Sequence, residues 1–431
     1  MIGRSAALTL FALFPRLVLM PHSADAQAQA PTPDAALAHA RALLRSTPLI
    51  DGHNDLPWEI RRATGHPRDV AAYDLRSRAP KHTDLERLAQ GQVGAQFWSI
   101  YVDGEMRDSG YARVQLEQFD IARRMIARYP DRLALALTAD DIERARKRGR
   151  LASLLGMEGG HAIENSLGAL RAYYALGARY MTLTHNVTLD WADAALDTAK
   201  HGGLTEFGRE VVREMNRLGM LVDLSHVSPA VMSDALDASE APVIFSHSAA
   251  RALVDHPRNV PDSILARLPK NGGVVMVTFV PQFVSNECKA WDDSLQAEIK
   301  AATAAVADTA EIRRRTEAWQ AAHPPPTSTL AQVADHIEHV RQVAGVDHVG
   351  VGSDFDGIDY VPAGLEDVSK FPELFAELIR RGWSDADLKK LAGRNLLRAL
   401  RTAEGTAARL QREREPSTRT IEELDGARPA S

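Results

Sequence analysis

A regular alternation of short apolar runs with longer amphipathic stretches is the feature that most restricts the fold of this chain. Helical stretches such as 110–129, 163–176, 205–218, 229–236 and 330–344 separate eight runs of strand-forming residues. We expect the eight strands at 49–51, 95–102, 151–157, 179–183, 220–224, 243–245, 274–279 and 349–352. Strands that alternate with helices form parallel sheets, so the pattern predicts an α/β fold. Eight units favour a (β/α)8 TIM-like barrel, and an open, doubly wound sheet is the alternative.

Three segments differ from this alternating region. Residues 1–30 combine Arg4, a largely apolar run and small residues at 24–28, a pattern typical of a secretory signal peptide; a disordered extension is the alternative. Residues 286–328 are expected to form a helical insertion between the seventh and eighth strands. Residues 31–401 are assigned to the barrel, and 402–431 to a polar tail that we expect to be disordered. The length of 431 residues therefore requires only one large domain.

Composition narrows the partners and the location of the protein. The 51 basic and 57 acidic residues give a net charge of −6, which disfavours a nucleic-acid partner. The single cysteine, Cys288, excludes a disulfide within the chain and a zinc site built from cysteines. Beyond the first thirty residues, no run approaches the ~18 apolar residues that cross a bilayer. We therefore expect an exported protein, periplasmic or secreted, without a membrane anchor.

Polar side chains follow most of the predicted strands at the point where each strand ends. The carboxyl ends of barrel strands meet at one face, where active sites lie. Histidine and carboxylate groups bind zinc when cysteine is absent. The five groups at strand ends are enough for two zinc ions ~3.5–4 Å apart with a bridging hydroxide. They are His53, Asp55, Glu158, His226 and His247. Each alone would suit an ordinary polar or capping role, and only their convergence predicts a metal centre.

The motifs around these residues also match a known family. The chain resembles the renal (membrane) dipeptidase family of zinc peptidases, within the amidohydrolase-type metal barrels. The matching segments appear in the family order and cover roughly residues 47–400. They are Ile50-Asp51-Gly52-His53-Asn54-Asp55, Gly156-Met157-Glu158-Gly159-Gly160, Leu183-Thr184-His185-Asn186, Asp223-Leu224-Ser225-His226, Phe245-Ser246-His247-Ser248 and Gly352-Ser353-Asp354-Phe355-Asp356-Gly357.

The resemblance implies a role for each ligand and substrate contact. His53 and Asp55 would bind one zinc ion, His226 and His247 the other, and Glu158 would bridge both. His185 would contact the reacting carbonyl group.

Arg258 would hold the carboxylate of a dipeptide substrate, because a guanidinium offers paired donors. Without the resemblance, Arg258 would be interpreted as a surface ion pair. Asp354 is expected to transfer the proton, with Asp356 as the alternative, and His161 to support the site from nearby.

The implied activity is zinc-dependent hydrolysis of dipeptides, with tolerance of D-residues at the C-terminal position. One alternative is a metal hydrolase of the same barrel that acts on another amide, a lactam or a lactone. Another is a relative that retains metal without turnover. The resemblance also leaves a homodimer open, although no sequence feature indicates an interface.

Overall fold

The computed structural model of this protein describes residues 1–3, 31–106 and 110–426. The chain divides into a short segment, Met1–Ala30, and a compact unit that begins at Pro31. The predicted signal peptide therefore lies almost entirely outside the described residues. No helix in the described part of the chain is long and apolar enough to cross a bilayer.

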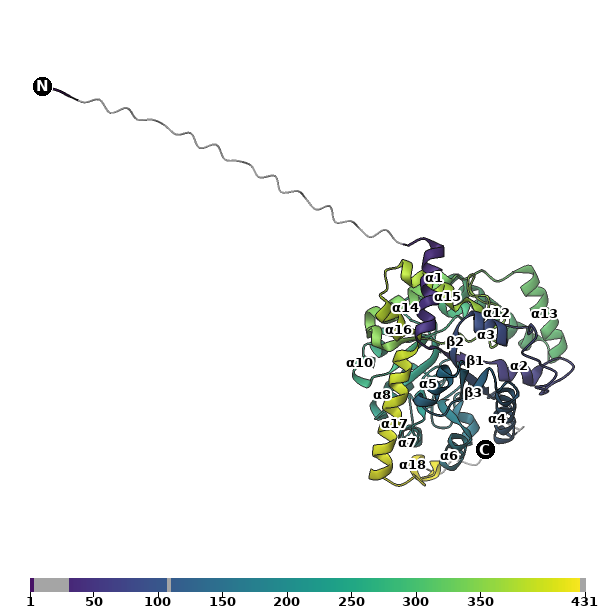
Figure 1. Ribbon diagram of the computed structural model, residues 1–431. Coiled ribbons are helices and arrows are strands. Elements are labelled where there is room, and N and C mark those ends of the chain that lie inside the picture. Colours follow the sequence, from purple (N-terminus) through teal and green to yellow (C-terminus); the bar gives the residue numbers. More distant parts are fainter. Residues whose placement is uncertain (4–30, 107–109, 427–431) are drawn as a thin grey trace. The chain divides into compact units, whose positions relative to one another are not determined.

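The compact unit is built around a closed barrel of parallel strands (Figure 1). Its strands are β1 (Leu49–Asn54), β2 (Val93–Tyr101), β4 (Leu151–Glu158), β5 (Ala178–Thr182), β6 (Leu221–Asp223), β7 (Ile244–Ser248), β8 (Val274–Val277) and β9 (Val349–Val351). Pairing of β2 with β4 closes the ring, and Ala95–Tyr101 lie opposite Ala152–Glu158. The predicted (β/α)8 barrel is confirmed, and the open sheet is excluded.

One short strand was not predicted. β3 (Leu133–Leu135) pairs with the first residues of β4, alongside the ring rather than within it. Three residues carry too little periodicity to be recognised as a strand.

Helices surround the barrel. The longer ones are α1 (Pro33–Ser46), α4 (Tyr111–Arg128), α5 (Ala139–Lys147), α6 (Leu167–Leu176), α7 (Glu206–Leu218), α8 (Pro229–Ala238), α14 (Leu330–Ala344) and α15 (Phe371–Arg380). The shorter ones are α2 (Leu56–Arg62), α3 (Leu85–Gln90), α9 (Asp262–Leu265), α10 (Leu268–Asn271), α11 (Pro281–Val284) and α16 (Asp385–Lys389). Capping explains several boundaries. Thr329 and Gln332 form a capping box at the start of α14, and left-handed Gly219 ends α7.

The insertion at residues 286–328 is helical as expected, but it is not one continuous helix. The insertion contains two helices, α12 (Asn286–Ala305) and α13 (Thr309–Ala322), because Asp308 caps a new helix after a break. Rings of Trp291 and Trp319, 5.8 Å apart, join the two.

The prediction of a disordered tail from residue 402 is wrong for the residues that the structure describes. α17 (Asn395–Glu413) passes through this point beside α7, and α18 (Ile421–Asp425) follows (Figure 1). Ala403, Ala407 and Leu410 recur at helical spacing and are buried. Arg409 and Arg414 both pair with Glu240. The buried face is narrow and rich in alanine, so the sequence reads as polar.

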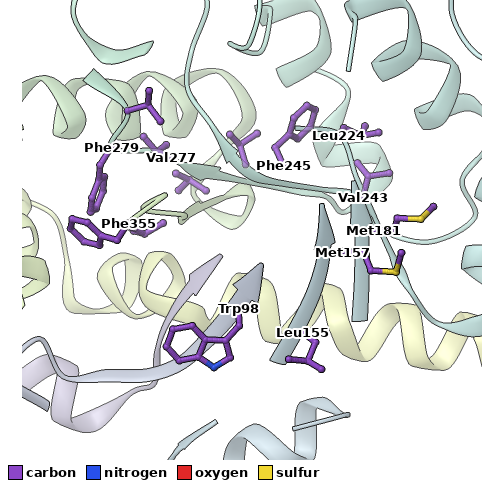
Figure 2. Packing of buried hydrophobic residues seen from close by; sticks show 14 of the residues in the cluster. Trp98, Leu155, Met157, Met181, Leu224, Val243, Phe245, Val277, Phe279 and Phe355 are labelled. Carbon is purple, nitrogen blue, oxygen red and sulfur yellow. The ribbon is translucent and has the colours of Figure 1, made fainter. Parts of the chain in front are cut away.

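Alternating side chains build two apolar layers. Trp98, Met157 and Phe245 belong to the large cluster between strands and helices, and Figure 2 shows them on different strands. Residues of opposite parity, such as Phe97 and Leu154, belong to a separate cluster that joins the inward side chains of the strands to residues of α5 and α17. Because side chains alternate along a strand, the inward positions continue from this apolar filling to polar residues at the carboxyl ends.

Candidate metal centre

The five predicted metal ligands converge around Glu158, the last residue of β4. One carboxylate oxygen of Glu158, Oε2, lies 3.3 Å from Nε2 of His53. The other oxygen, Oε1, lies 3.1 Å from Nε2 of His226 and 3.5 Å from Nε2 of His247. Asp55 completes the group, with Oδ2 3.2 Å from Nε2 of His53. The two oxygens of one carboxylate thus face different histidines, the arrangement that a bridging ligand requires.

One histidine and one aspartate reach this centre through unusual backbone positions. His226 and Asp354 both have φ of +68°, in the left-handed region that non-glycine residues rarely adopt. Such conformations cost of order 1–3 kcal/mol and persist where the surroundings require them. Gly357 is needed for a related reason, because a Cβ there would lie 2.3 Å from Oδ2 of Asp55.

Hydrogen bonds determine which ring nitrogen of two ligand histidines carries the proton. Nδ1 of His226 lies 2.9 Å from Oδ1 of Asn186, which can only accept. Nδ1 of His247 lies 2.8 Å from the Ser246 hydroxyl, which itself donates to Asp223 at 2.6 Å. Both Nδ1 atoms are therefore donors, and both Nε2 atoms present lone pairs.

The two Nε2 atoms face each other, and neither carries a proton that could form a hydrogen bond between them. Nε2 of His226 and Nε2 of His247 lie only 2.9 Å apart, beside the Glu158 carboxylate. Burial, together with the charge of Arg258, holds the pKa of each imidazole well below its usual range, so both are neutral. Two lone pairs and a carboxylate at such separations repel one another unless a cation lies between them. The donor set therefore fits a bound metal, which neutral nitrogen and carboxylate oxygen atoms would hold.

His53 occupies the opposite side of Glu158. Its Nδ1 lies 2.8 Å from the Tyr180 hydroxyl, and its buried Nε2 has no hydrogen-bond partner among the described residues. Burial opposes a charge on His53, but Tyr180, Glu158 and Asp55 outweigh it and raise the pKa of this imidazole. Its Nε2 thus faces two carboxylates and offers a second place for a cation.

The predicted substrate and proton-transfer residues lie around this centre. Oδ1 of Asp354 is 4.0 Å from Nε2 of His53, and burial raises the pKa of this carboxyl group well above its usual range. Nε2 of His185 lies 3.9 Å from Oε1 of Glu158, and its ring contacts those of Tyr101 and His226.

Asp356 faces a different environment. Its Oδ1 accepts a hydrogen bond of 2.9 Å from the backbone N–H of His82, and its own N–H donates to Nδ1 of His82. It holds the 82–83 segment against the loop after β9, and Asp354 is the acid that the structure brings to the metal ligands. His161 donates from Nε2 to the carbonyl of Val102 at 2.9 Å, which joins the loops after β2 and β4.

Arg258 is a buried cation with no carboxylate in ion-pair contact among the residues that the structure describes. Its side chain is almost wholly buried, and Nε and Nη1 have no hydrogen-bond partner among the described residues. Burial lowers its pKa to about 10, so the guanidinium remains charged at neutral pH. Its charge contributes to the lowered pKa of His185, His226 and His247, so it acts electrostatically on the centre. A surface ion pair is therefore excluded, and a buried, unpaired guanidinium calls for an anionic ligand.

Comparison with known proteins decides the family. Residues 37–414 match the family model described as "Membrane dipeptidase (Peptidase family M19)". The chain belongs to the membrane dipeptidase family. Within this family it is 42% identical over 386 residues to the dipeptidase verJ of Clonostachys rogersoniana, across 87% of this chain and 89% of that protein.

Solved structures of similar peptidases share this fold. The probable dipeptidase PvdM from Pseudomonas aeruginosa has a TM-score of 0.77 at 27% identity, covering 87% of this chain and all of that one. A metallopeptidase from Rhodobacter sphaeroides, bound to a phosphinate mimic of the dipeptide L-Ala-D-Ala, has a TM-score of 0.68 at 25% identity. That match covers 83% of this chain and 99% of that one. The resemblance seen in the sequence motifs is confirmed.

Several residues of this dipeptidase site were not predicted. Tyr180, Asn186 and Ser246 each contact the far nitrogen of a ligand histidine, and Asp223 accepts from Ser246. Ser246 and Asn186 stand next to predicted residues in sequence, so a search for partners beside each histidine would have found them. Tyr180 shows no such signal, because an aromatic residue in a buried strand reads as core.

Proposed function

We propose that this member of the membrane dipeptidase family holds two zinc ions and hydrolyses dipeptides. The observation that carries the proposal is a buried, unpaired guanidinium beside a cluster of neutral imidazoles and carboxylates. The cluster is suited to a cation and the guanidinium to a carboxylate. His53, Asp55, Glu158, His226 and His247 would hold the metal, with Glu158 shared.

Bound zinc would polarise the scissile carbonyl group and activate a water molecule for attack. Side chains of the protein would bind the substrate, stabilise the developing charge and transfer the proton. Arg258 binds the C-terminal carboxylate of the substrate through paired N–H donors, which limits the substrate to two residues. His185, neutral at physiological pH, donates a hydrogen bond to the carbonyl oxygen as negative charge develops there.

Asp354 moves the proton in this scheme. Its carboxylate accepts a proton from the attacking water and passes it to the leaving amine, the ordinary work of a general base that becomes a general acid. The carboxyl group lies among Asp55 and Glu158, and burial favours its protonated form. A pKa raised from the usual range of a carboxyl group toward neutral pH lets the group both take up and release a proton, which suits this exchange.

The substrate class includes dipeptides with a D-residue at the C-terminal position. The Rhodobacter sphaeroides metallopeptidase binds a mimic of L-Ala-D-Ala. We extend this stereochemical tolerance to the present chain because Arg258 would recognise the carboxylate, a group common to both configurations.

The direct test is hydrolysis of a dipeptide panel by the zinc-loaded mature chain. Each dipeptide is paired with its C-terminal amide, which lacks the carboxylate. We expect hydrolysis of L-L and L-D dipeptides, two zinc ions per chain, and a large loss of kcat/KM for every amide. Absence of hydrolysis across the panel would refute dipeptidase activity. Equal rates for acids and amides would instead favour a hydrolase of other amides, lactams or lactones.

We also propose that residues 1–30 direct export and are removed. Mass spectrometry of the protein from the periplasmic or secreted fraction of a bacterial host tests this. The expected mature chain begins near residue 31, and an intact N-terminus on protein retained in the cytoplasm would contradict it.

A further inference from the structure

A tyrosine inside the barrel, Tyr180, contacts the ring nitrogen of one ligand histidine that faces away from the metal centre. Tyr180 lies in β5 and is fully buried, and its hydroxyl is 2.8 Å from Nδ1 of His53 in β1. The two residues are 127 positions apart in sequence, so only barrel closure brings them together. The Tyr180 ring also packs against Phe97, with ring centroids 4.9 Å apart.

A glycine in the neighbouring strand makes room for this ring. Gly156 in β4 pairs in register with Tyr180. A Cβ at position 156 would lie 2.0 Å from Cζ of Tyr180, so a side chain there would force the ring to move. Two residues further along β4, on the same face, stands Glu158. One strand therefore supplies both the shared carboxylate and the space that lets Tyr180 reach His53.

We propose that Tyr180 is a positioning residue that sets the affinity of the ion held by His53 and Asp55. With Nδ1–H of His53 donating to the Tyr180 hydroxyl, Nε2 is the nitrogen turned toward Asp55 and Glu158, where it holds a proton in the metal-free chain and would hold zinc when zinc is bound. The other two ligand histidines have partners of their own, Asn186 and Ser246. Loss of the Tyr180 hydroxyl should therefore weaken one ion and spare the other. The inference rests on the proposed zinc-dependent function.

The size of the effect follows from other metal sites. Removal of a hydrogen-bond partner behind a ligand histidine typically costs 10–100-fold in metal affinity. Tyr180→Phe deletes one oxygen atom and keeps the ring that packs on Phe97. Tyr129→Phe is the matched control, because Tyr129 is equally buried and its hydroxyl bonds to Leu75 and Asp74, far along the chain from any ligand.

The experiment measures zinc per chain by elemental analysis across a series of buffered free-zinc concentrations. Wild type and Tyr129→Phe should bind two ions alike. Tyr180→Phe should keep one ion at wild-type affinity and bind the other roughly 10–100-fold more weakly. Unchanged binding of both ions, or equal weakening of both, would overturn the proposal. A purely structural role would lower the melting temperature of the metal-free chain without this asymmetry.

Further variants keep the proposal testable if Tyr180→Phe does not fold. Gly156→Ala retains the hydroxyl but displaces the ring, and should weaken the same single ion. Unchanged zinc binding in a folded Gly156→Ala chain would count against the proposal.

Asn186→Ala removes the partner of His226 and should weaken the other ion. The double variant Tyr180→Phe/Asn186→Ala should then retain no tightly bound zinc, and one tight ion remaining would overturn the assignment to separate ions. Wild type that fails to bind two zinc ions would refute the proposed function itself, a result distinct from all of these.

Discussion

Buried histidines of the described residues include some at the mouth of the barrel, where the carboxyl ends of the strands meet, and others away from it, such as His336 in the layer between barrel and helices. In the outer layer, His336 of α14 accepts a hydrogen bond from the backbone N–H of Ala250 and bonds to the backbone of Val284. At the mouth, Nε2 of His226 and Nε2 of His247 face each other and a carboxylate. Burial of an imidazole therefore says little about metal binding. The informative feature is a ring nitrogen that the protein leaves facing other acceptors.

The largest expected effect comes from the residue that joins the histidines at the mouth. Glu158→Gln preserves shape but removes the shared negative charge. We expect zinc content to fall and kcat/KM to drop by at least ~10⁴-fold, because several kcal/mol of metal-ion catalysis disappear. Elemental analysis and dipeptide hydrolysis measure the two effects.

Leu154→Ala is the matched control for Glu158→Gln. Leu154 lies on the same face of β4, four residues earlier, within the apolar filling of the barrel. Its truncation should cost about 2–5 kcal/mol of stability while both zinc ions remain. Loss of zinc from a folded Leu154→Ala chain would contradict the prediction, because it would show that an apolar residue inside the barrel affects zinc binding as Glu158 does.

The second effect separates Asp354 from Asp356, two acids on the same loop. Asp354→Asn should lower kcat by about 10²–10³-fold with zinc content retained, since a general base or acid contributes of that order. Asp356→Asn should act mainly on stability, because Asp356 contacts His82 rather than the metal ligands. Steady-state kinetics beside zinc analysis test both, and a larger kcat loss in the Asp356 variant would reverse the assignment.

A histidine outside the mouth, His336, should make the stability of the protein depend on pH. Burial lowers the pKa of His336 from 6.5 to about 4. The unfolded chain therefore takes up a proton below pH 6.5 that the folded chain refuses. Stability from this group is complete above pH 6.5 and is lost as pH falls toward 4, by roughly 3 kcal/mol in all. In the metal-free chain, His336→Gln should flatten the stability profile over this range by that amount.

Urea unfolding at several pH values measures the profile. Val340→Ala, in the same helix, is the control, because Val340 is buried but cannot titrate. It should lower stability equally at every pH. An equally steep acid loss in the His336 variant would mean that other groups carry the dependence.

Particular residues show how far sequence reasoning reaches in this fold. Strands of the barrel and the donors directly after them were predictable because burial and strand ends both leave local patterns. Tyr180 was not, since its meaning depends on Gly156 in another strand. Asp354 and Asp356 share strand parity in the sequence, but left-handed φ values at both positions remove that parity in the structure. What escaped prediction is therefore contact across the barrel and backbone turns, which no short window of sequence contains.

The smallest expected effect tests how the mouth holds a substrate rather than a metal. Phe283 of α11 lies under Arg258, with the guanidinium carbon 5.1 Å from the ring centroid. Its backbone carbonyl accepts a hydrogen bond of 2.8 Å from Asn259.

Phe283→Leu keeps apolar volume but removes the aromatic face that orients the cation. We expect KM for dipeptides to rise about 3–10-fold with kcat unchanged, because a desolvated cation–π contact contributes about 1 kcal/mol or somewhat more. Dipeptide amides, which lack the carboxylate, should show no such rise, and Phe119→Leu in α4 should leave KM unchanged. An equal rise for acids and amides would show that Phe283 supports the pocket in general and does not act through Arg258.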